Sequence, residues 1–276
     1  MDALGMTSRW IAAARERESR RPDRLFDDPL AGLLAGDEGR ATMASIEAAS
    51  GVADNPYLTI RTRFLDDFLV EAMRDDLRQI VILAAGMDAR AFRLAWPPGT
   101  VVFEVERGEV LDHKRAVLAE AQVPPPRARR VEVCADLRGD YRASLRSAGY
   151  SESQPTAFLL EGLLPYLLDE TTALSILSGV AAIAAPDSRL ALDMIGQSFL
   201  HSPFMKRHLD HLRALGVPWQ FGDDDPEGLL SRAGFTEVAV RQPGEVGHGR
   251  WPHPTVPRSV PGIPRAYLVV ARRRAR

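Results

Sequence analysis

From residue 79 onward, short apolar segments alternate regularly with segments of helical spacing. Five apolar runs of strand length lie at residues 79–83, 100–105, 130–134, 156–160 and 189–193, and helices are predicted between them, among them 109–121 and 169–184. Buried strands joined by helices in this order are typical of a parallel sheet with helices on both faces. Two further strands are predicted at residues 235–240 and 267–270. The chain is therefore expected to build an α/β fold around one sheet.

Two regions depart from this alternation. Residues 1–75 are predicted to be helical, with apolar residues at helical spacing over 57–73 and with Thr7 or Ser8 as the first helix cap. Residues 196–222 are amphipathic and aromatic, and we expect them to cap the strand ends. We divide the chain into an N-terminal helical extension (1–75), a cofactor-binding α/β core (76–195), a cap insertion (196–222) and the C-terminal part of the core sheet (223–276).

Charge and cysteine content exclude several classes of protein. There are 35 basic and 37 acidic residues, and a net charge of −2 does not favour binding to nucleic acid or to a membrane surface. The single cysteine, Cys134, excludes a disulfide framework. The longest apolar runs are far shorter than the ~20 residues of a membrane span, and Arg15 and Glu16 lie where a signal peptide would be apolar. We therefore expect a soluble cytoplasmic protein.

Acidic and small residues follow the predicted strands. In an open α/β sheet, ligands bind beyond the carboxyl ends of the strands. Ala85 and Gly86 follow the first strand and allow close approach to the backbone, but the pattern is not the G-x-G-x-x-G of nicotinamide-binding proteins. The next three strands lead into Glu106, Asp136 and Glu161. Taken singly, each of these features has a simpler explanation: a tight turn for the small residues, and a surface position or a helix N-cap for the acids. Taken together, the small residues and the three acids favour a pocket for a cationic nucleoside.

Several longer motifs resemble those of bacterial S-adenosylmethionine-dependent methyltransferases of the leucine carboxyl methyltransferase superfamily. The resemblance covers about residues 8–272 and is carried by residues 18–31, 61–67, 85–94, 103–106, 135–138 and 161–166. It implies a class I methyltransferase fold, which is Rossmann-like, with a seven-stranded and mostly parallel sheet whose last strand is antiparallel. It also implies that the cofactor is S-adenosyl-L-methionine.

The resemblance assigns residues to the methionine part of this cofactor. It implies that Arg61 holds the methionine carboxylate, a bidentate task suited to a guanidinium group. Arg17 lies near a second basic position with the same role. Ala85 and Gly86 would lie against the methionine part, and Glu161 would lie near the amino group.

The resemblance also assigns residues to the nucleoside part. Glu106 matches an acid that binds the ribose, and Asp136 and Leu137 match the adenine contacts. Two positions depart from the family pattern, because Ala84 replaces the first glycine of a more usual Gly-Ala-Gly and Glu106 replaces a more usual aspartate. A methyl group at residue 84 and a longer acid at residue 106 would both alter the fit of the cofactor.

Four residues are expected to bind the methyl acceptor: Tyr166, Phe204, Trp219 and His248. The cap aromatics are equally compatible with a small core of the cap itself. A carboxylate acceptor is ionised and needs no base, whereas a phenol with a pKa of ~10 benefits from one. His208 and His211 lie three positions apart, and we interpret them as a solvated helix face, so no metal site is predicted.

Together these features lead to the hypothesis of an O-methyltransferase for a small-molecule carboxylate or phenol, of the polyketide-like kind made in secondary metabolism. The alternatives are a protein C-terminal carboxyl methyltransferase and a non-catalytic protein that binds S-adenosyl-L-methionine. A nucleic-acid methyltransferase is disfavoured because the sequence shows no basic face. The sequence singles out no catalytic residue and no oligomeric state.

Overall fold

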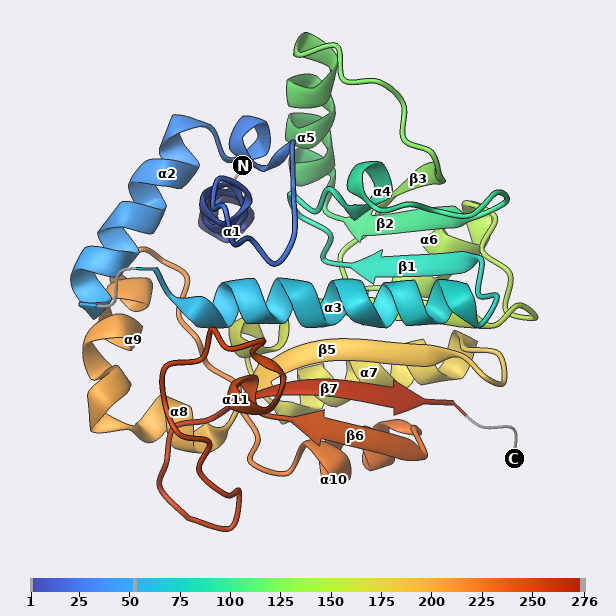
Figure 1. Cartoon of the computed structure of the whole chain (residues 1–276). Helices are drawn as coiled ribbons and strands as arrows, with labels where there is room; N and C mark the ends of the chain where they lie inside the picture. Colours follow the sequence, from blue (N-terminus) through green and yellow to red (C-terminus); the bar gives the residue numbers. More distant parts are fainter. Residues whose placement is uncertain (1, 52–53, 274–276) are drawn as a thin grey trace.

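The centre of the molecule is a seven-stranded sheet with helices on both of its faces (Figure 1). A computed structural model describes residues 2–51 and 54–273 of the chain. The strand order is β3-β2-β1-β4-β5-β7-β6, and β7 is antiparallel to both of its neighbours, while the other pairs are parallel. The strands are β1 (Gln79–Leu83), β2 (Val101–Glu106), β3 (Arg129–Cys134), β4 (Thr156–Leu160), β5 (Arg189–Ile195), β6 (Glu237–Arg241) and β7 (Ala266–Arg272). This confirms the predicted class I fold.

The carboxyl ends of the parallel strands form one edge of the sheet. Every residue of β1, β4 and β5 is buried, as expected for apolar strands covered on both faces. Leu83 ends β1 and pairs with Val105 on one side and with Leu160, the last residue of β4, on the other. Because β7 runs in the opposite direction, its first residue, Ala266, pairs with Ile195 at the end of β5. The loop that precedes β7 therefore reaches the same edge.

Two apolar cores lie on opposite faces of the sheet. One core includes side chains of α6 (Tyr141–Ser147), α7 (Glu170–Ile183) and α10 (Pro226–Ala233). The other includes side chains of α3 (Pro56–Arg74) and α4 (Arg90–Arg93). The predicted helix over 57–73 is thus α3, whose cap is Asn55, and the predicted helices over 109–121 and 169–184 are α5 (Gly108–Glu120) and α7.

The N-terminal helices α1 (Ala3–Ser19) and α2 (Ala31–Ser50) pack against each other beside the carboxyl edge of the sheet (Figure 1). The expectation that Thr7 or Ser8 caps the first helix is wrong. The cap is Asp2, whose carboxylate accepts from the backbone N–H of Gly5. Thr7 and Ser8 lie inside the helix, where their hydroxyls donate to backbone carbonyls of the preceding turn.

Residues 196–222 contain three short helical elements, α8 (Gln197–His201), η2 (Pro203–Met205) and α9 (Lys206–Ala214). Helix α9 packs against α2, so this cap insertion and the N-terminal helices enclose the carboxyl edge together. Two shorter elements complete the edge, η1 (Leu164–Tyr166) after β4 and α11 (Pro243–Val246) in the loop before β7. Among the described residues, no helix is long and apolar enough to cross a membrane.

Candidate active site

A cavity of about 1010 Å³ lies at the carboxyl edge of the sheet, between the strand ends, α1, α3 and the cap insertion. This volume is at the upper end of the ~300–1,000 Å³ of small-molecule sites, which leaves room for two ligands. Tyr166 and Trp219 line it, whereas Phe204 and His248 do not. The eight residues expected to hold the cofactor all line it: Arg17, Arg61, Ala85, Gly86, Glu106, Asp136, Leu137 and Glu161.

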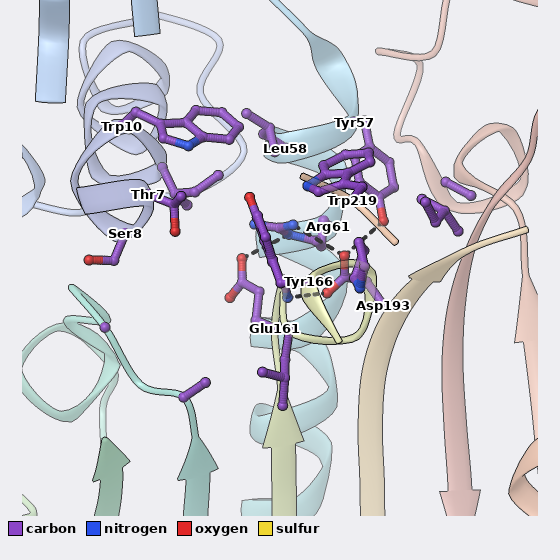
Figure 2. Close-up of a pocket in the computed structure, with 18 of the residues that line it drawn as sticks. Thr7, Ser8, Trp10, Tyr57, Leu58, Arg61, Glu161, Tyr166, Asp193 and Trp219 are labelled. Atoms are coloured by element: carbon purple, nitrogen blue, oxygen red, sulfur yellow. Dashed lines mark hydrogen bonds and ion pairs between the residues drawn. The ribbon is translucent and has the colours of Figure 1, made fainter. Parts of the chain in front are cut away.

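Arg61 occupies the middle of the cavity wall. It comes from α3, is 5% exposed, and lies between Glu161 and Asp193 (Figure 2). Its Nε donates to Glu161 over 3.0 Å and its Nη1 donates to Asp193 over 3.1 Å. Among the described residues, Nη2 has no acceptor, and Nη1 keeps a second N–H, so these groups are left for a ligand carboxylate. A ligand carboxylate bound by Arg61, as expected from the sequence, would therefore share the guanidinium group with the carboxylates of Glu161 and Asp193.

Glu161 carries a negative charge that two arginines stabilise. One carboxylate oxygen accepts from Arg61 and the other accepts from Nη1 of Arg90 over 2.7 Å. Burial alone would raise the pKa of Glu161, but Arg90, Arg61 and Arg15 together hold it well below its usual range. The carboxylate is therefore ionised at neutral pH, and it is available to face a cationic group of a ligand.

Asp193 is a site residue that the sequence reasoning missed. Its carboxylate accepts from Arg61, from the hydroxyl of Tyr57 over 3.0 Å and from the backbone N–H of Gly162 over 2.6 Å. Burial and the charge of Asp193 raise the pKa of Tyr57 far above its usual value, so this hydroxyl stays protonated as a donor. The sequence did offer one indication, because Asp193 is an acidic residue at the end of an otherwise apolar predicted strand. That strand, β5, continues for two residues beyond its predicted end.

The loop after β1 is held tightly by its neighbours. Gly86 has a φ of +45°, and its N–H donates to Glu106 over 3.0 Å. Two cations from other elements bind the carbonyls that follow, since Arg15 donates to Met87 and Lys114 donates to Asp88. Burial raises the pKa of Glu106, although the N–H groups of Arg107 and Gly86 oppose this shift. Side chains from β2, α1 and α5 thus hold the loop where it lines the cavity.

The far end of the cavity is more open. Asp136 and Leu137 follow β3, and Asp136 is exposed and paired with Arg138 over 2.6 Å, which lowers the pKa of this carboxylate. The alternative role of Asp136 as a helix cap is not found, because Asp140 caps α6. Arg17 lines the cavity but is already paired with Glu47 over 2.6 Å.

Aromatic rings surround the part of the cavity next to Arg61. Figure 2 shows Tyr57, Tyr166 and Trp219 close to its guanidinium group, with Trp10 of α1 farther away across the cavity. The ring centres of Tyr166 and Trp219 lie 6.1 Å apart in an edge-to-face contact. An apolar compartment therefore adjoins the charged centre of the site.

The other cap aromatics divide between several environments. Phe199 and His208 contact Trp219, with ring centres 5.7 and 5.2 Å away, and both line the cavity. Phe221 is buried in the core that includes side chains of α6, α7 and α10. Phe204 is 89% exposed because the turn η2 directs it outward.

His248 lies apart from the cavity, in the loop before β7. Its Nε2 is 3.7 Å from a carboxylate oxygen of Asp67 on α3. No group of three metal-ligating side chains occurs within residues 2–51 and 54–273.

Sequence comparison identifies relatives of this chain. Residues 8–181 match the family model described as Leucine carboxyl methyltransferase. A Mycolicibacterium gilvum protein, provisionally named an S-adenosyl-L-methionine-dependent methyltransferase, is 40% identical over 228 residues, which cover 78% of this chain and 74% of that protein. A Mycobacterium avium protein with the same provisional name is 35% identical over 295 aligned positions, which cover 99% of this chain and 94% of the relative.

Solved structures share the fold at lower identity. A DUF574 family protein of Streptomyces avermitilis superposes with a TM-score of 0.63 at 16% identity, covering 95% of this chain and 96% of that one. A Thermobifida fusca protein, provisionally named a methyltransferase, gives a TM-score of 0.59 at 19% identity, covering 95% and 94% of the two chains. At these identities the likeness shows the fold alone. With the sequence relatives, however, the assignment is plain: the chain belongs to the leucine carboxyl methyltransferase family and is an S-adenosyl-L-methionine-dependent methyltransferase.

Proposed function

We propose that this protein methylates an oxygen atom of a small-molecule carboxylate or phenol, of the polyketide-like kind made in secondary metabolism. The observation that carries the proposal is the aromatic compartment beside Arg61, formed by Trp10, Tyr57, Tyr166 and Trp219. Flat rings of this kind suit an apolar or aromatic acceptor. A carboxylate acceptor also agrees with the description of the matching family.

The residues around the charged centre fit S-adenosyl-L-methionine, which supplies an electrophilic methyl group when bound. We assign the methionine carboxylate to Nη2 of Arg61, which has no acceptor among the described residues. Glu161 is assigned to the amino group because it is ionised and faces the cavity. Glu106 is assigned to the ribose hydroxyls, as its carboxylate lies at the end of β2 beside Gly86.

Asp136 and Leu137 are assigned to the adenine. Leu137 is half-buried and supplies an apolar surface for a flat base, while Asp136 supplies a hydrogen-bond acceptor. Arg17 is left without a cofactor role as long as it pairs with Glu47, so its contribution to binding is expected to be smaller than that of Arg61.

The reaction needs alignment more than acid–base chemistry. The acceptor oxygen forms a bond to the methyl carbon while the bond from that carbon to sulfur breaks and its electron pair stays on sulfur. Holding the two partners in line and excluding water contributes up to ~7–11 kcal/mol. We assign this positioning to the walls of the compartment, above all to Tyr166 and Trp219, which pack against each other.

A carboxylate acceptor is already ionised, so no base is needed for it. A phenol needs a proton acceptor. His208 is the candidate for that role because it lines the cavity next to Trp219. Burial and the neighbouring His211 lower the pKa of His208, so the ring is neutral at neutral pH and can take a proton.

The test is a transfer assay with methyl-tritiated cofactor, aromatic carboxylates and phenols, and a cell lysate. We expect label in small organic molecules. For a transferring acceptor, Trp219→Ala should raise KM by about tenfold and leave the cofactor Kd unchanged. Phe204→Ala is the matched control, because Phe204 is exposed and outside the cavity.

Three results would contradict the proposal. Label found in proteins alone would favour protein carboxyl methylation. Cofactor binding without any label transfer would favour a non-catalytic role. An unchanged acceptor KM in Trp219→Ala would place the acceptor elsewhere.

A further inference from the structure

The loop before β7 (residues 242–265) carries a buried cation that the assigned cofactor contacts do not use. This loop lies at the carboxyl edge of the sheet (Figure 1). Its last residue, Arg265, is 6% exposed, lines the cavity and has no carboxylate partner among the described residues. The other described arginines of the cavity wall all form ion pairs with carboxylates: Arg15, Arg17, Arg61, Arg107 and Arg138.

Backbone carbonyls alone hold the guanidinium group of Arg265. Nη1 donates to the carbonyl of Ile263 over 3.2 Å, and Nη2 donates to the carbonyls of Pro257 and Val260 over 2.7 Å each. Within the described part of the chain, Nε is buried without an acceptor, and Nη1 keeps a second N–H. A buried charge is costly unless it is paired, and carbonyl dipoles offset only part of this cost. The side chain is therefore suited to an anion that enters the cavity.

The acids on neighbouring elements are engaged elsewhere. Asp193 of β5 accepts from Arg61 and from the hydroxyl of Tyr57. Asp224, which follows the cap insertion, accepts from the backbone N–H of Ser198 over 3.1 Å and from its hydroxyl over 2.9 Å. In the described structure, no acid of residues 242–265 lines the cavity. This wall of the cavity therefore presents a cation with no acid beside it on the same loop.

The other arginines of the loop have structural partners. Arg250 pairs with Glu18 of α1 over 3.2 Å, and Arg258 pairs with Glu227 of α10 over 2.6 Å. Together with the carbonyl bonds of Arg265, these ion pairs fasten the loop to two helices and to itself. A guanidinium group fixed in this way loses little conformational entropy when it binds an anion.

Arg265 lies apart from the place assigned to the reacting end of the cofactor. Its carbonyl accepts from the N–H of Gly196 over 2.9 Å, just beyond the paired residues Ile195 and Ala266 of β5 and β7. The residues assigned to the cofactor belong to α3 and to the segments at the ends of β1 to β4, and β7 lies two strands beyond β4 in the sheet. Neighbouring strands are about 4.8 Å apart, which places Arg265 about 10 Å along the edge from β4.

The wall around Arg265 is also partly aromatic. The rings of Trp251 and His253 both line the cavity, and their centres lie 5.7 Å apart in an edge-to-face contact. Ile263 and Pro264 add apolar surface next to the arginine. An aromatic acid would match this combination of rings and a cation.

We propose that Arg265 binds a carboxylate of the methyl acceptor, and that this carboxylate is not the group that is methylated. The acceptor is therefore an aromatic acid whose charge is retained in the product. For a hydroxy acid, the hydroxyl oxygen bonds to the methyl carbon, the electron pair of the carbon–sulfur bond stays on sulfur, and the hydroxyl proton passes to His208. The inference rests on the proposed function, because it takes the ligand at Arg265 to be the acceptor.

The test compares acids with their neutral amides. The probes are para-hydroxybenzoate with para-hydroxybenzamide, and a hydroxynaphthoate with its amide, titrated by calorimetry into the full chain saturated with S-adenosyl-L-homocysteine. We expect the acid of at least one pair to bind about 10- to 100-fold more tightly than its amide. Arg265→Met should bring the ratio of the two Kd values close to one, and Arg265→Lys should retain part of the preference because it keeps the charge.

The ratio separates charge recognition from a structural role. Loss of the carbonyl bonds in Arg265→Met loosens the loop and weakens binding of acid and amide alike, whereas only the loss of the cation removes the difference between them. Arg273→Met is the matched control. Arg273 also donates to two backbone carbonyls, those of Ala181 and Gly234, but lies outside the cavity lining, so the ratio should keep its wild-type value.

The inference would be overturned if each wild-type Kd for an acid equalled that of its amide, or if neither acid bound. An acid preference that persisted in Arg265→Met would overturn it as well. The methyl-transfer assay distinguishes this failure from failure of the proposed function. If the acids bound through Arg265 but label entered proteins alone, the proposed function would fail. If neutral and acidic small molecules were labelled with equal kcat/KM, methylation of small molecules would stand and the role of Arg265 would be refuted.

Discussion

Gly86 is the position where a single methyl group should disturb the site most. Its backbone has a φ of +45°, and a Cβ atom added there would lie 2.6 Å from Cβ of Ser8 on α1. Ordinary contacts of such atoms are 3.4–4 Å, so helix and loop would have to separate. Cβ of Ser8 is fixed to the helix backbone and cannot swing aside.

The cost of Gly86→Ala has two parts. A left-handed conformation costs an L-residue about 1–2 kcal/mol. Overpacking adds about 1–3 kcal/mol. We therefore expect the free energy of unfolding to fall by about 2–5 kcal/mol. Cofactor affinity should fall as well, because the loop that lies against the ligand is displaced.

Urea unfolding followed by circular dichroism measures the first effect, and a double-mutant cycle separates its two parts. Ser8→Gly removes the clashing atom, so in the double variant the overpacking part should be recovered as a coupling of about 1–3 kcal/mol. Gly99→Ala is the matched control, since Gly99 has a φ of +80° and nothing within 4 Å of an added Cβ. It should cost about 1–2 kcal/mol, which is the conformational part alone.

Two outcomes would refute this reasoning. The close approach of α1 to the loop would be disproved if Gly86→Ala were no more destabilising than Gly99→Ala. The same conclusion would follow if the stabilities of the two single variants simply added in the double variant.

Three further predictions follow from the site and the loops around it. The pKa of Glu161 lies below its ordinary value near 4.5, so its ionised form stabilises the fold above that pH and loses this effect as the pH falls. Glu161→Gln should reduce the loss of thermal stability in acid and cost about 3–5 kcal/mol at neutral pH, and an unaltered pH profile would contradict this. Ala84 has a φ of +53°, so Ala84→Gly should raise the free energy of unfolding by about 1 kcal/mol in urea titrations, and a lower value would argue against strain. Arg265 donates to three carbonyls of residues 257–263, so Arg265→Met should speed amide hydrogen exchange in that loop, whereas unchanged exchange would show that other contacts hold it.

The sheet could be predicted from the sequence because its strands are short apolar runs with clear ends. The strand over 156–160 has the predicted bounds, and β1 does too. Helices α6 and α10 were missed because they have only 7 and 8 residues, too few for a clear helical period. The start of α1 was misjudged because two hydroxyl residues resemble a cap even inside a helix.

The acids and small residues that follow the strands also indicated the carboxyl edge of the sheet as the ligand site. Parallel strands bring their carboxyl ends to the same edge, regardless of the segments that connect them. The sequence could not predict which aromatic residues of the cap insertion line the cavity. Trp219 lines the cavity and Phe204 faces solvent, although both belong to the same predicted segment. Their directions depend on the turn at η2 and on the packing of α9 against α2.

What the sequence alone determined is the fold class, the family and the edge of the sheet that holds the ligand, because local apolar patterns and contiguous motifs encode them. What only the tertiary structure decided is the state of the charged groups at that edge. Glu161 and Asp193 lie 100 and 132 residues after Arg61 along the chain, yet both form ion pairs with it, over 3.0 and 3.1 Å. Burial and partner charges act through space, so the folded chain sets which donors remain free and which charge is left for the ligand.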